Sequence, residues 1–150
     1  MKFLFKTEDH WQGLILRLGL GLVMFPHGAQ KVLGWFGGYG FSATMGAFTG
    51  KMHIPAIFAL LAILAESAGS IGLITGCLTR VAAFGILCNM AVAVAMVHIP
   101  NGFFMNWTGK QAGEGFEYHL LAITIAFALI LTGGGKWSVD RAISSRIRGE

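Results

Sequence analysis

Long apolar stretches, separated by small groups of charged residues, are the dominant pattern of this chain. Between Lys51 and Arg80 the only charged residue is Glu66, and between Arg80 and Lys110 there is none. Each interval can hold the roughly 20 apolar residues that a helix needs to cross a bilayer. The pattern therefore predicts two transmembrane helices joined by a tight turn. These two spans cover about residues 55–77 and 81–99.

Two further apolar stretches complete the pattern. One covers about residues 118–133 and ends at three consecutive glycines, which terminate a helix. The other covers about residues 11–29 and contains a charged residue, Arg17. No internal repeat or second apolar core interrupts this series. We therefore predict one all-α domain over residues 1–150, an integral membrane four-helix bundle.

The composition supports a membrane location. The chain is 55% hydrophobic and 12% charged, whereas soluble domains contain about 25% charged residues. The net charge of +4 is not gathered into basic runs, so nucleic acid is not an expected partner and the lipid bilayer is. Cys77 and Cys88 lie within apolar stretches and lack the spacing of a metal site.

Lysine and arginine are divided unequally between the two sides of such a bundle. Apart from Arg17 within the first span, seven fall on the side of the termini and three on the other. Because positive residues concentrate on the cytoplasmic side, we expect both termini to be cytoplasmic. The seven are Lys2, Lys6, Arg80, Lys136, Arg141, Arg146 and Arg148, and the three are Lys31, Lys51 and Lys110.

The first outer loop contains a helical pattern of its own. Phe41, Met45, Phe48 and Met52 recur at the spacing of one helix face. An apolar stripe of this kind is typical of a helix that lies in the membrane interface. We therefore predict an interfacial amphipathic helix in this loop.

Two ionisable residues within the predicted spans need partners, because a charge inside a membrane is costly. Arg17 and Glu66 lie at depths that differ by several ångströms, a distance that an extended arginine side chain covers. We therefore predict a buried ion pair between Arg17 and Glu66. Such a pair either only orients two helices or allows Glu66 to move protons.

A second polar group is expected at the outer ends of the helices. His27, Lys31, His98 and Glu117 all lie there, and Asn89 lies on the inward stripe of the third span. Together these residues form a candidate pocket for a headgroup or a quinone ring. Glu117 and His119 are about 200° apart on a helix and cannot both face inward. No metal site is therefore expected.

The chain resembles the DoxX family of small membrane proteins at several of these residues. The resemblance extends over about residues 10–143. It implies a four-helix bundle in the inner membrane, and better understood members are similar to a subunit of a thiosulfate:quinone oxidoreductase. The residues that carry the resemblance are Arg17, His27 to Lys31, Glu66, Gly69, Gly72, Gly76, Thr79, Arg80, His98, Glu117, Tyr118, Gly133 to Gly135 and Trp137 to Asp140.

The resemblance leads to one expected function and two alternatives. The expected function is an accessory or quinone-facing subunit of a membrane redox system, with a quinone as ligand, no intrinsic cofactor and a redox protein as partner. The alternatives are a non-catalytic scaffold for another membrane protein and a transporter of a small solute. Whether the chain is an enzyme, and whether it forms a homo-oligomer, stay open at this point.

Overall fold

The computed structural model describes residues 2–148, and every regular element in that range is a helix. The prediction of an all-α chain is therefore confirmed. The elements are α1 (Lys2–Phe5), α2 (Trp11–Leu33), α3 (Gly40–Gly46), the π-helical turn η1 (Ala47–Lys51), α4 (Ala56–Glu66), α5 (Ala68–Thr75), α6 (Thr79–Ala93), η2 (Val94–His98), η3 (Ile99–Asn101), α7 (Glu117–Thr132) and α8 (Val139–Arg148).

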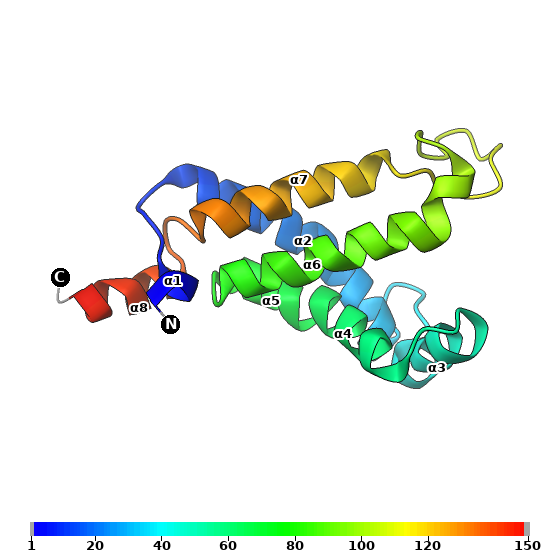
Figure 1. Cartoon of the computed structure of the whole chain (residues 1–150), viewed down its shortest axis with the longest axis horizontal. Coiled ribbons are helices and arrows are strands. Elements are labelled where there is room, and N and C mark those ends of the chain that lie inside the picture. The colour runs from blue at the N-terminus through cyan, green and yellow to red at the C-terminus, as the bar shows by residue number, and fades with distance from the viewer. Residues whose placement is uncertain (1, 149–150) are drawn as a thin grey trace.

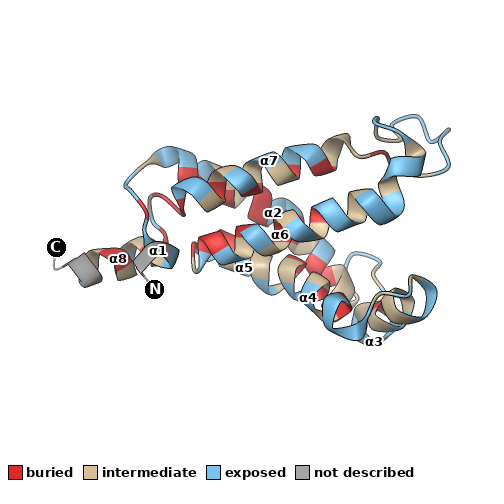
Figure 2. Ribbon diagram, viewed as in Figure 1, coloured by how far each residue is buried: buried red, intermediate tan, exposed pale blue. Residues whose placement is uncertain are grey.

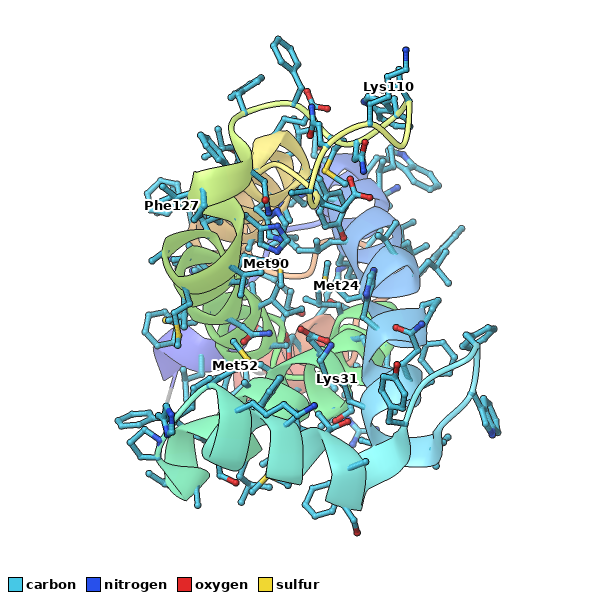
Figure 3. All side chains as sticks on the ribbon, turned by 90° about the vertical axis from the view of Figure 1, so that its right-hand side faces the viewer. Met24, Lys31, Met52, Met90, Lys110 and Phe127 are labelled. Carbon is cyan, nitrogen blue, oxygen red and sulfur yellow. The ribbon has the colours of Figure 1, made fainter. Side chains whose placement is uncertain are left out.

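The helices α2, α4, α5, α6 and α7 pack along one another in an elongated bundle (Figure 1). α6 packs along α7, while α2 packs against α4, α5 and α7. α1 and α8 lie together at one end, which we call the terminal end. The opposite end, which we call the loop end, consists of α3 and residues 102–116. Seen from that end, the loop that carries Lys110 and the α3 segment lie on opposite sides of the bundle (Figure 3).

Two of these segments are long and apolar enough to cross a membrane, Ala56–Thr75 and Thr79–Asn101. The helix Glu117–Thr132 is apolar but shorter. Only 28% and 22% of the residues in the most apolar windows of these two segments are buried, and the others are partly or fully exposed (Figure 2). Phe84 on α6 is among the large apolar side chains that face outward. A surface of this kind favours lipid over water as its surroundings.

The helix boundaries lie close to the predicted spans, with one informative difference. α2 does not end near residue 29 but continues to Leu33, where Gly34 adopts the left-handed conformation with φ of 72°. Glycine favours that conformation, which commonly terminates a helix. The extension keeps Lys31 on the helix, so its side chain lies along the bundle rather than in a loop.

Residues 40–51 are helical, as predicted for the first outer loop. The helix changes from α to π geometry after Gly46. Thr44 is buried, whereas Phe41 is exposed. The segment therefore has one side against the bundle and one exposed side.

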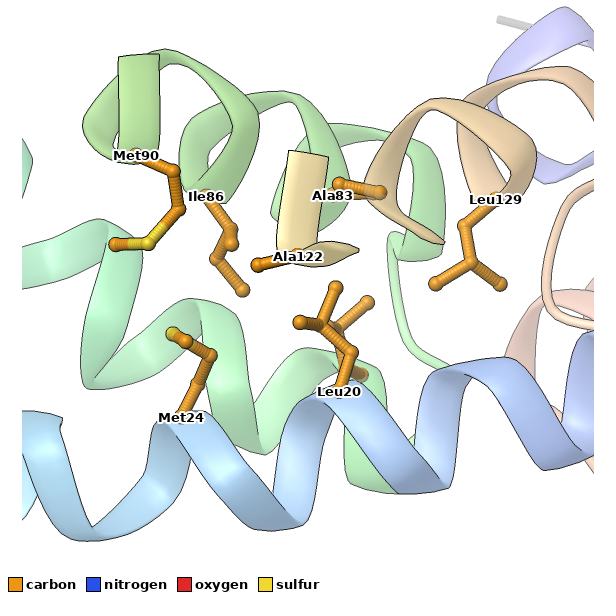
Figure 4. Packing of buried hydrophobic residues seen from close by; sticks show 9 residues of the cluster. Leu20, Met24, Ala83, Ile86, Met90, Ala122 and Leu129 are labelled. Carbon is orange, nitrogen blue, oxygen red and sulfur yellow. The ribbon is translucent and has the colours of Figure 1, made fainter. Parts of the chain in front are cut away.

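The apolar core runs along the centre of the bundle. Leu20 and Met24 of α2 point toward Ile86 and Met90 of α6, and Leu129 of α7 closes the core toward the terminal end (Figure 4). Small residues allow the helices to approach one another, as is common in membrane bundles.

α2 approaches the second span closely where α4 gives way to α5. A Cβ atom added at Gly28 of α2 would lie 2.5 Å from the carbonyl oxygen of Glu66. Ser67 separates α4 from α5, and its hydroxyl donates to the carbonyl of Ile63 at 2.7 Å. Glycine at position 28 therefore lets α2 pack directly against the break in the second span.

Candidate functional site

Glu66 is the centre of a buried polar group that joins three helices. It is the last residue of α4 and is 5% exposed. Its Oε2 atom forms an ion pair with the ammonium of Lys31 on α2. Its Oε1 atom accepts a hydrogen bond of 2.6 Å from the Asn89 side chain on α6. Since both carboxylate oxygens have partners, Glu66 carries its charge inside the bundle with compensation from two neighbours.

The predicted Arg17–Glu66 ion pair is wrong, because the structure gives both residues other partners. Arg17 is 2% exposed, and all of its hydrogen bonds go to backbone carbonyls. A planar guanidinium has five N–H donors, and here each of them is used. The acceptors are the carbonyls of Gly134 at 3.0 Å, Leu73 at 3.1 Å, Ile74 at 2.5 Å, and Lys136 and Trp137 at 3.1 Å each.

The position of Arg17 along α2 explains why it bonds backbone carbonyls and not Glu66. Leu73 and Ile74 lie in the last turn of α5, where carbonyls carry partial negative charge, and the Leu73 carbonyl also accepts from the Gly76 N–H at 3.2 Å. Lys31 follows Arg17 by 14 residues in the sequence, or about 21 Å along a helix. Because α2 extends to Leu33, Lys31 is the residue that reaches the depth of Glu66.

The terminal end contains a second set of helix-capping contacts. Asp140 is 1% exposed, and its carboxylate accepts hydrogen bonds from the backbone N–H groups of Leu78 at 2.7 Å and Thr79 at 2.8 Å. These N–H groups lie at the start of α6, where a negative charge is stabilising. Arg80 donates to the carbonyls of Ile130 and Lys6. Asp140, Arg17 and Arg80 therefore hold the terminal end together.

Tyr118 and His119 add polar atoms to the interior at the start of α7. The His119 side chain is buried, with the residue 7% exposed. Within residues 2–148, the Tyr118 hydroxyl and the His119 Nδ1 atom are buried without a hydrogen-bond partner. Tyr118 interacts electrostatically with Glu66, and His119 with His98 and His27. We call Lys31, Glu66, Asn89, Tyr118 and His119 the polar cluster.

The structure assigns different positions to the residues of the predicted pocket. Lys31 and Asn89 meet at Glu66. The His98 ring lies 3.9 Å from the His119 ring, measured between centroids, and its Nδ1 atom bonds the Glu114 carbonyl at 2.8 Å. His27 is exposed on α2.

Glu117 does not join the polar cluster. Its Oε1 atom accepts from the Met105 backbone at 2.9 Å and from the Trp107 indole at 3.1 Å. Glu117 therefore fastens the loop of residues 102–116, and His119 is the residue that faces inward. The sequence contains a signal for the inward position of His119, because it begins a stripe of small and apolar residues at helical spacing. All residues of this stripe are buried in the structure. The others in that stripe are Ala122, Ala126 and Leu129.

An apolar region borders the polar cluster toward the terminal end. Met24 is 1% exposed and Met90 is 5% exposed. Met24 of α2 and Met90 of α6 both belong to the core between these helices (Figure 4). Flexible thioether side chains adapt to a flat apolar surface. In the described part of the chain, no three His, Cys, Asp or Glu side chains are grouped to hold a metal ion.

Comparisons with known proteins were consistent with one another. A family model described as DoxX matches residues 13–99. The chain is 31% identical over 142 residues to uncharacterized membrane protein Rv3486 of Mycobacterium tuberculosis (strain ATCC 25618 / H37Rv), a match that covers 89% of this chain and 82% of that protein. No solved structure matches the chain. The family match includes Arg17, Glu66 and Asn89 and ends before α7.

Proposed function

The chain belongs to the DoxX family and is a membrane protein, and from that premise we propose that its polar cluster binds the headgroup of a quinone. In this proposal the protein is a quinone-facing or accessory subunit of a membrane redox system. It crosses the inner membrane four times, with both termini in the cytoplasm.

One observation carries the proposal, namely buried polar atoms without partners beside a buried ion pair. The Tyr118 hydroxyl and the His119 ring nitrogen have no hydrogen-bond partner among the described residues. Leaving such an atom unsatisfied costs about 1–3 kcal/mol. A quinone carbonyl oxygen accepts hydrogen bonds, so a bound headgroup would satisfy the Tyr118 hydroxyl, and His119 in its Nδ1–H tautomer. The flat apolar ring would lie against Met24 and Met90.

The same cluster has the groups that proton transfer to such a ligand requires. Reduction of a quinone to a quinol takes up electrons and protons in equal number, and a redox protein partner would supply the electrons. In this proposal the Glu66 carboxylate, held in place by Lys31 and Asn89, relays protons that come from outside the bundle by first accepting each proton and then passing it on. His98 stacks on His119 and is partly exposed, so it connects the cluster to the loop end.

The four-span topology is compatible with the structure of each segment. α2 contains Arg17, whose charge is compensated by five backbone carbonyls. α7 has 16 residues, or about 24 Å of helix, which is shorter than the roughly 30 Å hydrocarbon core. Local thinning of the bilayer accommodates a short span at modest cost.

A binding titration tests the proposal. A water-soluble quinone analogue is added to the delipidated protein in mild detergent, and binding is followed by calorimetry. We expect saturable binding that weakens about tenfold in Tyr118→Phe and in His119→Phe, because each loses one hydrogen bond worth about 1.5 kcal/mol. The control Tyr39→Phe, at a residue that is 88% exposed, should bind like the wild type.

The result that would overturn the proposal is equally specific. If a folded, delipidated wild type shows no saturable binding, the quinone function is wrong. If binding occurs but is unaffected in both variants with normal melting, the ligand lies elsewhere than the polar cluster.

A non-catalytic scaffold is the second candidate, and exposed aromatic residues at the loop end favour it. Trp35, Phe36 and Tyr39 protrude from the connection between α2 and α3, and Trp107 is 84% exposed. Aromatic side chains of this kind are enriched where proteins bind one another. The scaffold function requires a stable partner that is lost in Tyr39→Ala or Trp107→Ala, together with the absence of quinone binding.

A further inference from the structure

Two tryptophans and a lysine form an exposed cluster at the terminal end, far from the polar cluster. The rings of Trp11 and Trp137 meet edge to face, with their centroids 5.3 Å apart. The Lys136 ammonium lies 4.4 Å from the centre of the Trp11 ring. Trp11 is 51% exposed and Trp137 is 73% exposed. The cluster therefore presents indole surface and a positive charge together.

The backbone of Lys136 and Trp137 is held in place by hydrogen bonds to neighbouring residues. The carbonyls of Lys136 and Trp137 both accept hydrogen bonds of 3.1 Å from Arg17, and the Lys136 N–H donates to the His10 carbonyl at 3.1 Å. Trp137 adopts a left-handed backbone conformation, with φ of 53°. A non-glycine residue rarely adopts this conformation unless its surroundings impose it. Arg17 therefore holds the loop in place, with the Trp137 side chain exposed and the Lys136 ammonium over the Trp11 ring.

The charge of Lys136 is not neutralised within the described part of the chain. No carboxylate there lies within 4.0 Å of its ammonium, whereas the neighbouring Arg141 pairs with Asp9 at 2.8 Å. Lys6, also at the terminal end, is exposed. An ammonium held on an indole face without a carboxylate is suited to an external anion.

We propose that Trp11, Lys136 and Trp137 form a binding site for the headgroup of an anionic phospholipid. Tryptophan is enriched at the level of the lipid headgroups, where its ring is apolar and its N–H is polar. A lysine at that level attracts the phosphate of an anionic lipid. The exposed indole surface favours a lipid over a free anion, because only a lipid also offers apolar glycerol and acyl groups for the rings to contact. The site does not depend on the proposed quinone function.

Quenching of tryptophan fluorescence by brominated lipids tests the site. The full chain with Trp35→Phe and Trp107→Phe retains tryptophan only at positions 11 and 137. In mild detergent it is titrated with phosphatidylglycerol or phosphatidylcholine, each brominated on its acyl chains. We expect half-maximal quenching at an about fivefold lower concentration of phosphatidylglycerol, the factor that corresponds to one lysine near an anionic surface. Lys136→Gln should remove this preference, whereas Lys136→Arg and the loop-end control Lys51→Gln should retain it.

Three outcomes would overturn the proposal. Equal quenching by the two lipids would show that the cluster does not select an anion. A preference that persists in Lys136→Gln, in protein with an unchanged melting temperature, would place the anion site elsewhere. Competition by inorganic phosphate at the lipid concentration would show that the site binds a free anion rather than a lipid.

Discussion

The ion pair between Lys31 and Glu66 leads to a quantitative prediction about stability. In Lys31→Met the Glu66 carboxylate keeps only the Asn89 hydrogen bond while remaining 5% exposed. Removing one partner of a fully buried pair costs about 3–5 kcal/mol. The Lys31 side chain is 23% exposed, so screening by the surroundings lowers the expected loss to about 2–3 kcal/mol.

The reciprocal variant should lose less. In Glu66→Gln the unpaired lysine can extend its flexible side chain toward the interface, so we expect a loss of about 1–2 kcal/mol. In the double variant neither charge remains, and a neutral pair of similar size is expected to lose about 1 kcal/mol. The two single losses exceed the double loss by about 2–4 kcal/mol, and this coupling energy is far above the ~0.5 kcal/mol scatter of independent sites.

A second double-mutant cycle distinguishes the Lys31–Glu66 ion pair from the Arg17–Glu66 pair that the sequence predicted. Arg17→Lys is combined with Glu66→Gln, and all variants are unfolded in mild detergent by added dodecyl sulfate while circular dichroism is recorded. Since Arg17 bonds only carbonyls, its losses should add to those of Glu66. Additive losses for Lys31 with Glu66, or strong coupling for Arg17 with Glu66, would refute our assignment of partners.

Three further predictions follow from the packing and the proposed topology. Asp140→Asn should lower stability by about 1–3 kcal/mol, because one buried N–H at the start of α6 loses its acceptor; thermal melting measures this. Gly28→Ala should cost about 1–3 kcal/mol through overpacking against the second span, whereas Gly19→Ala, with nothing within 4 Å, should be tolerated. A cysteine at Gly109 should react with an impermeant thiol reagent on intact cells and one at Ser145 should not, whereas the reverse labelling pattern would invert the proposed orientation.

The main helices were predictable because their signals are local. Intervals without charge set the second and third spans, and three consecutive glycines end α7 near Gly133. The length of α2 was underestimated, since the predicted span ended near residue 29 whereas the helix continues to Leu33. A charged residue such as Lys31 does not end a helix by itself, and the left-handed Gly34 three residues later was the better signal.

The partners of Arg17 were not predictable from residue types. Its acceptors are backbone carbonyls more than 50 residues away, and every residue carries such a carbonyl. A search for an oppositely charged side chain therefore led to Glu66, the acidic residue within the second span. Only the packing of α5 and the loop after α7 around the guanidinium reveals the true contacts.

In contrast, the sequence was sufficient to predict which of Glu117 and His119 faces inward on α7. Helical geometry allowed only one of them to face inward, and charge alone favoured the glutamate. The alanines that follow His119 at helical spacing show which face packs against the bundle. The Trp107 indole N–H and the Met105 backbone N–H of the neighbouring loop provide the glutamate with partners outside the core.

Photolabelling with an azido-quinone tests the central claim of a quinone site at the polar cluster most directly. The folded protein is irradiated with the probe in mild detergent, digested, and the modified peptides are sequenced by mass spectrometry. We predict labelling that saturates with probe concentration and falls on the start of α7 around Tyr118 and on α2 between Met24 and Lys31. Labelling that does not saturate, or that falls on lipid-facing residues such as Phe84 and Phe127, would contradict a quinone site within the bundle.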